Sequence, residues 1–206
     1  MIEKLTWFRK VMAGLGKRIY YWKNRKINLY SFNSMIRNNL KIYGKINNDD
    51  YETGLIDWSA QLEELAKNVI IEMINKPIIF GLSMESVLSK RIEDLPFLVG
   101  LIFWALLGKD HKDIWPIPYL VMEENGVVKA VVRQNSCIAC TEENKLTQKD
   151  FGELGMCNVI AVVMKGILQA LQDYVGNDYD ITKEITKCFM RGDDYGEFIY
   201  TLTPRK

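Results

Sequence analysis

The chain has 206 residues, of which 48% are apolar and 26% are charged. This composition is that of a globular protein, and it excludes a disordered, collagen-like or low-complexity chain. The net charge is only +1, but the charges are unevenly placed. Residues 1–45 carry eleven Lys or Arg and one acid, whereas residues 46–206 carry sixteen Lys or Arg and twenty-five acids. Such a split predicts a basic extension that meets something anionic, such as nucleic acid, a lipid surface or the acidic body of the chain itself.

The start of the sequence has no apolar core and no small-residue cleavage site, so we expect no secretory signal. The longest apolar run, residues 95–107, has thirteen residues, which is too short to span a bilayer. We therefore expect a cytoplasmic protein. In that compartment its four cysteines are metal ligands, redox groups or core residues rather than structural disulfides.

We expect two parts, a basic aromatic N-terminal extension over residues 1–45 and an α+β domain over residues 46–206. Gly14 and Gly16 predict a break in the helical pattern of the extension. Aromatic and cationic residues that suit an anionic surface or membrane follow as Tyr21, Trp22, Lys23, Arg25 and Lys26. The plain alternative is that the aromatic residues pack on the body of the protein, and single-stranded nucleic acid is less favoured.

The rest of the chain predicts helices, a hairpin, a helix and a second hairpin. After a turn at residues 47–50, apolar spacing predicts a helix over residues 55–74, a second over 84–91 and a fully apolar, buried one over 95–107. Asn125-Gly126 predicts a hairpin between strands 119–123 and 127–134. A helix over 151–174 and strands over 181–190 and 195–202 follow. This order predicts an α+β fold with helices on an antiparallel sheet built from two hairpins.

The cysteines are the main candidates for chemistry. Cys137 and Cys140 have C-x2-C spacing after a strand, Cys157 lies in the first turns of a helix, and Cys188 lies near the end of a strand. Together these four thiols could form a tetrahedral zinc site. An iron–sulfur cluster, a redox pair at Cys137 and Cys140, and simple core packing are the alternatives.

Other catalytic patterns are missing. The single histidine, His111, excludes H-E-x-x-H chemistry, and no phosphate-binding loop or G-x-S-x-G motif occurs. We therefore assign no catalytic residue and expect a protein that is not an enzyme, while a cysteine-dependent enzyme stays an alternative.

The last fifty residues resemble the 4-vinyl-reductase domain family, a small-molecule-binding module. The matching elements are a helix that begins at Cys157 and carries Gly166, the segment Glu184–Cys188, and the Gly192-Asp193 turn before the final strand. The final family cysteine falls at Gly196 here. The resemblance implies the fold shared with trafficking-complex (TRAPP) subunits, a homodimer, and an apolar ligand cavity. Its candidate wall residues are Phe103, Trp104, Leu107, Trp115 and Phe198.

The sequence thus favours a non-catalytic module that binds a hydrophobic small molecule and holds a cysteine metal site, with zinc as the expected metal. The alternative is a trafficking or scaffold-type interaction protein that uses its basic N-terminal segment on a membrane or a protein partner.

Overall fold

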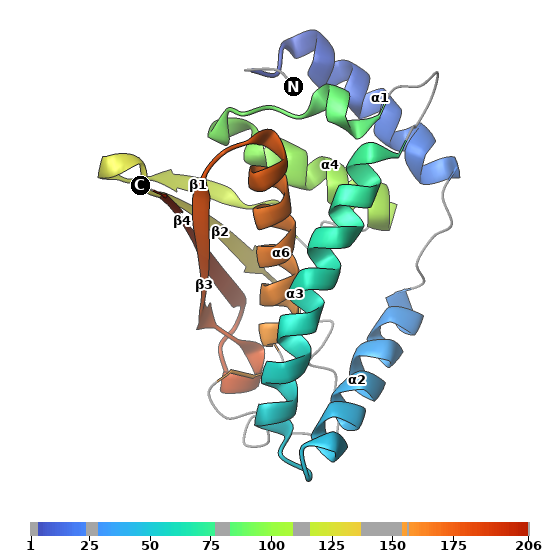
Figure 1. Cartoon of the computed structure of the whole chain (residues 1–206), viewed down its shortest axis with the longest axis vertical. Helices are drawn as coiled ribbons and strands as arrows, with labels where there is room; N and C mark the ends of the chain where they lie inside the picture. The colour runs from blue at the N-terminus through green and yellow to red at the C-terminus, as the bar shows by residue number, and fades with distance from the viewer. Residues whose placement is uncertain are drawn as a thin grey trace.

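The computed structural model describes residues 4–23, 29–76, 83–108, 116–136, 154–155 and 157–205. Five α-helices lie in these ranges: α1 (Trp7–Lys23), α2 (Leu29–Ile46), α3 (Tyr51–Asn75), α4 (Leu95–Leu107) and α6 (Cys157–Val175). The strands are β1 (Tyr119–Met122), β2 (Val128–Gln134), β3 (Tyr179–Lys187) and β4 (Gly196–Pro204). The α+β fold class and its element order are confirmed (Figure 1).

The four strands form one antiparallel sheet in the order β1-β2-β4-β3. Each predicted hairpin is present, and β2 and β4 join the two hairpins at the centre, where Val132 lies opposite Phe198. Alternate residues of the central strands are buried, which gives the sheet one apolar face for the helices. Helix α6 packs on this sheet, α3 packs on α6, and α2 packs on α3.

Close approach of α3 and α6 depends on a glycine. A Cβ atom at Gly166 would lie 2.5 Å from the carbonyl oxygen of Glu63, so a larger residue would push the two helices apart. The start of α3 is fixed by Asp50, whose carboxylate accepts a hydrogen bond from the Thr53 N–H at 3.0 Å. The turn before it places Asn48 and Asp49 at positive φ, as their residue types allow.

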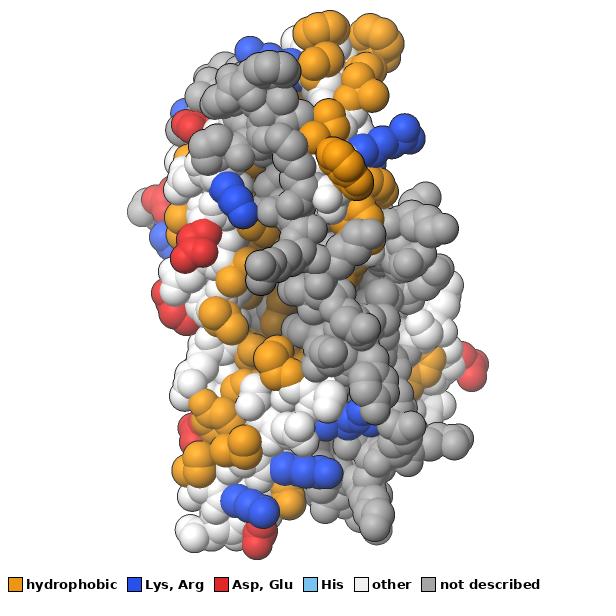
Figure 2. All heavy atoms as spheres, turned by 90° about the vertical axis from the view of Figure 1, so that its right-hand side faces the viewer, with side chains coloured by type: hydrophobic (Ala, Val, Ile, Leu, Met, Phe, Trp, Pro, Cys, Tyr) orange, Lys and Arg blue, Asp and Glu red, His pale blue; other side chains and the backbone are white. Residues whose placement is uncertain are grey.

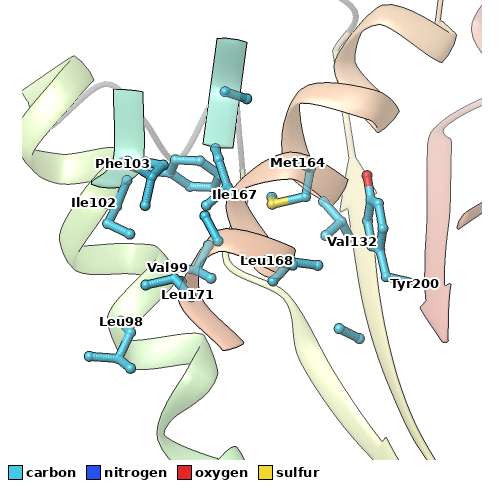
Figure 3. Packing of buried hydrophobic residues seen from close by; sticks show 14 of the residues in the cluster. Leu98, Val99, Ile102, Phe103, Val132, Met164, Ile167, Leu168, Leu171 and Tyr200 are labelled. Carbon is cyan, nitrogen blue, oxygen red and sulfur yellow. The ribbon is translucent and has the colours of Figure 1, made fainter. Parts of the chain in front are cut away.

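Helix α4 is the buried apolar helix that the sequence predicts, with Pro96 in its first turn. Its side chains pack with those of α6 in the main core. Figure 3 shows Val99 and Phe103 of α4 beside Ile167 and Leu171 of α6, with Val132 and Tyr200 of the sheet further along. A helix that is apolar all round needs cover on every side, and part of that cover comes from α1.

Two predictions about local structure are wrong. Gly14 and Gly16 do not break the first helix, because α1 runs without interruption from Trp7 to Lys23. Packing against α4 offsets the backbone entropy that two glycines cost. The helix expected over residues 84–91 is only a 3-10 turn, Met84–Val87, because extended backbone at Leu88 ends it.

The division of the chain at residue 45 stays a prediction. Leu5 and Ala13 near the N-terminus, and Ile36 and Leu40 of α2, belong to the same buried cluster as the core of the α+β domain. Within the described ranges, no helix has both the length and the apolar character needed to cross a bilayer.

Candidate functional site: the outer face of α1

A buried carboxylate fixes the start of α1 to the body of the protein. Asp94, which is 5% exposed, stands just before α4. It accepts hydrogen bonds from the Leu5 N–H at 3.1 Å and from the Ser89 hydroxyl at 2.9 Å, and it pairs with the Lys10 ammonium at 2.8 Å. Because three donors converge on one carboxylate, the entry of the chain into α1 has a defined position.

The charged form of Asp94 is favoured in this setting. Burial alone would raise the pKa of its carboxyl, but the hydrogen bonds from Lys10, the Leu5 N–H and Ser89 outweigh burial and hold the pKa below the ordinary value. The carboxylate therefore stays ionised at neutral pH, where it keeps its partners on α1.

The side of α1 that faces α4 carries two lysine side chains and the ring of Tyr21. The Lys10 ammonium lies 5.5 Å from the centre of the Phe97 ring, and the Lys17 ammonium lies 5.2 Å from the centre of the Trp104 ring. Tyr21 meets Trp104 edge to face at 5.2 Å. A Cβ atom at Gly108 would come within 2.5 Å of the Tyr21 ring, so the absence of a side chain at Gly108 leaves the space that this ring occupies.

The opposite side of α1 is apolar and exposed, and we call it the outer face. Its members are large hydrophobic residues that all lie at least 38% exposed: Trp7, Phe8, Val11, Met12, Leu15, Ile19 and Trp22. At 100° per residue they fall within about 140° of the helix circumference. Figure 2 shows hydrophobic side chains gathered at the end of the molecule where α1 lies. The two tryptophans near the helix ends are the most exposed, at 79% and 81%.

The predicted anion-binding residues do not all lie on one surface. Trp22 lies on the outer face, whereas Tyr21 packs against Trp104 on the opposite side. The side chain of Lys23, and both Arg25 and Lys26, lie outside the described residues. The sequence interpretation centred on residues 21–26 missed the apolar residues from Trp7 to Ile19, although their three- and four-residue spacing is visible in the sequence.

Two of the four cysteines come together in the structure. Cys157 begins α6 and Cys188 follows β3, and both are buried. The two thiols are hydrogen-bonded partners: the bond to Cys188 and burial raise the pKa of Cys157, whereas the bond from Cys157 lowers the pKa of Cys188. The Cys188 N–H donates to the Asp193 carboxylate at 2.9 Å, which fixes the following turn.

The metal site itself stays a prediction. Cys137 and Cys140 lie outside the described residues, and among the residues that are described no three His, Cys, Asp or Glu side chains cluster in a way that could hold a metal ion. Zinc analysis of the purified protein tests this prediction.

The predicted ligand-wall residues are spread over the core. Phe103 and Phe198 are fully buried among other hydrophobic side chains, and Leu107 is partly buried against the same core. Trp104 lies against α1, and Trp115 lies outside the described residues. Binding of a hydrophobic small molecule stays a prediction.

A comparison with solved structures finds a similarity to a trafficking protein particle complex subunit 3 from Naegleria fowleri covalently bound to palmitic acid. The sequence identity is 18% and the TM-score is 0.47, over 83% of this chain and 98% of that one. No family model matches the chain, and no curated protein matches it. Membership of the 4-vinyl-reductase domain family therefore stays a prediction.

Proposed function

We propose that this protein is a non-catalytic interaction protein that docks on a membrane surface through the outer face of α1. The observation that carries the proposal is the row of large apolar side chains that α1 exposes while its other side is held by α4. Removing such a row from water is favourable by about 25 cal/mol for each Å² of apolar area. Contiguous exposed apolar patches of this kind are typical of interaction surfaces.

The dimensions of α1 suit a helix that lies in the plane of the membrane. Its seventeen residues make it about 25 Å long, and charged residues recur along its length. Those charges oppose insertion across the bilayer, whereas a helix with one apolar and one polar side inserts its apolar side at the headgroup level. Trp7 and Trp22 stand near the two ends, and tryptophan is enriched at this level of the membrane.

The helix is also formed before it meets a membrane. An isolated helix of this length with two glycines would be marginally stable in water. Here Asp94 and the rings of Phe97 and Trp104 hold α1 in place. Docking therefore requires little new ordering of the backbone, which leaves more of the apolar burial as net binding free energy.

The experiment is sedimentation of the full chain with lipid vesicles that contain both neutral and anionic lipids. Leu15→Asp places a charge in the middle of the outer face, and we expect it to lower vesicle affinity by more than tenfold. Ile46→Asp is the matched control, because Ile46 is an exposed aliphatic residue at the end of α2, 68% exposed against 52% for Leu15. Absence of wild-type binding, or an equal loss in both variants, would contradict the proposal.

A further inference from the structure

The basic residues near the N-terminus whose side chains the structure describes divide into two groups. Between residues 4 and 23 the chain has no acid and six cations, which are Lys4, Arg9, Lys10, Lys17, Arg18 and Lys23. Three of them are engaged with the body. Lys10 pairs with Asp94, Lys17 lies over Trp104, and the Arg9 guanidinium donates to the Ser86 carbonyl at 3.2 Å.

Arg18 and Lys4 have a different setting. Both are exposed, and neither forms an ion pair with any residue that the structure describes. Arg18 comes three residues after Leu15 and four before Trp22, so it lies beside both on the helix surface. A cation at the border of an apolar face reaches the headgroup level when that face is inserted.

The rest of the chain has the opposite sign. After residue 23 the chain carries twenty-one cations and twenty-five acids, a net charge of −4. An anionic surface would repel this part of the protein and attract α1. The distribution of charge therefore favours an orientation in which α1 faces the surface.

We propose that the outer face of α1 docks on anionic lipid headgroups, with Arg18 as the residue that contacts the headgroup phosphates or carboxylates. This inference rests on the proposed function and adds the class of lipid and the orientation of the protein on it. Charge complementarity favours a lipid surface of this sign as the occupant, because α1 offers cations next to its apolar side chains and no acid.

The test compares the full chain on vesicles of phosphatidylcholine alone with vesicles that also contain 30 mol% phosphatidylserine, at low and high salt. Wild-type protein should bind the mixed vesicles at least about tenfold more tightly, and high salt should remove most of the difference. Arg18→Gln should weaken binding to the mixed vesicles about fivefold, the loss expected for one cation near the surface.

Lys17→Gln is the matched control, since it removes the same charge at the neighbouring position from the side of α1 that faces α4. We expect a clearly smaller loss for this variant. Equal losses in the two variants would overturn the assignment of Arg18, because they would mean that net charge alone attracts the chain. Equal binding of wild type to both vesicles would overturn the lipid selectivity and leave the proposed function standing. No binding to either would overturn both and leave a protein as the occupant of the outer face.

Discussion

Helices α1 and α4 pack against each other, yet they place their apolar side chains in opposite ways. Helix α4 is apolar on every side, and it is covered by α1 and by side chains of α6. Helix α1 turns Lys10, Lys17 and Tyr21 toward α4 and leaves its largest apolar side chains exposed. Burial in the core explains the apolar side chains of α4 but not those of the outer face of α1. The comparison therefore indicates that the outer face is an interaction surface.

The largest expected effect contrasts one phenylalanine on each helix. Phe103→Ala on α4 removes a fully buried ring and should lower the free energy of unfolding by about 3–5 kcal/mol. Phe8→Ala on α1 removes a ring that is mostly exposed and should change it by less than about 0.5 kcal/mol. Urea unfolding of both variants measures the difference. A large loss in Phe8→Ala would mean that the outer face is packed in the folded protein, contrary to the comparison.

An intermediate effect is expected at the contact that joins the two helices. Asp94→Asn leaves the Lys10 ammonium and the Leu5 N–H without their carboxylate, and we expect a loss of about 2 kcal/mol. Glu93→Gln is the neighbouring control, because Glu93 pairs with Arg91 at the surface and such pairs contribute little. Hydrogen exchange of the α1 amides should rise in Asp94→Asn alone. Unchanged exchange in that variant would show that Asp94 does not hold α1.

The contact between Asp94 and the start of α1 also predicts how the packing of α1 on the body of the protein depends on pH. The folded-state pKa of Asp94 lies below its ordinary value of 3.8, so its stabilising contribution is complete above that value. It is lost as the pH falls through the lower, folded-state pKa. Acid should therefore release α1 only well below pH 4 in wild type, and Asp94→Asn should lack this transition. Release near pH 5 or 6 would point to a different group.

Much of the fold could be predicted because its signals are local. Apolar residues without a polar side predict a buried α4, and the Asn125-Gly126 turn predicts the hairpin of β1 and β2. The continuity of α1 could not be predicted, because glycine propensity argues against it and only the contact with α4 overrides that propensity. The position of the site depends on long-range contacts. The hydrogen bond from Leu5 to Asp94 joins residues 89 positions apart, and it decides which side of α1 faces out.

The contact between two of the cysteines is likewise long-range and hard to predict from the sequence. The predicted metal site requires Cys157 and Cys188 to meet, and the structure places the two thiols together across 31 positions. Their spacing alone carries no information on this contact, which depends on how α6 packs on the end of β3. Whether they hold a metal with Cys137 and Cys140 stays a prediction.

The smallest expected effect concerns the glycines of α1. A Cβ atom at Gly14 would have no neighbour within 4 Å, so Gly14→Ala should stabilise the protein by about 0.5–1 kcal/mol through lower backbone entropy of the unfolded chain. Gly108→Ala at the end of α4 should do the opposite, because Gly108 has φ +72° and touches Tyr21. Thermal unfolding of the two variants checks the sign. Destabilisation by Gly14→Ala would mean that α1 needs flexibility there.

The most direct test of the central claim measures how deep α1 enters the bilayer. Wild type, Trp7→Phe and Trp22→Phe are mixed with vesicles whose acyl chains are brominated near the headgroups, and tryptophan fluorescence is recorded. A helix lying flat on its outer face predicts that Trp7 and Trp22 each contribute a similar share of the quenching. Two results would contradict the claim that the outer face of α1 meets the membrane. One is that the brominated vesicles do not quench the tryptophan fluorescence of the wild type. The other is that both variants are quenched as much as the wild type.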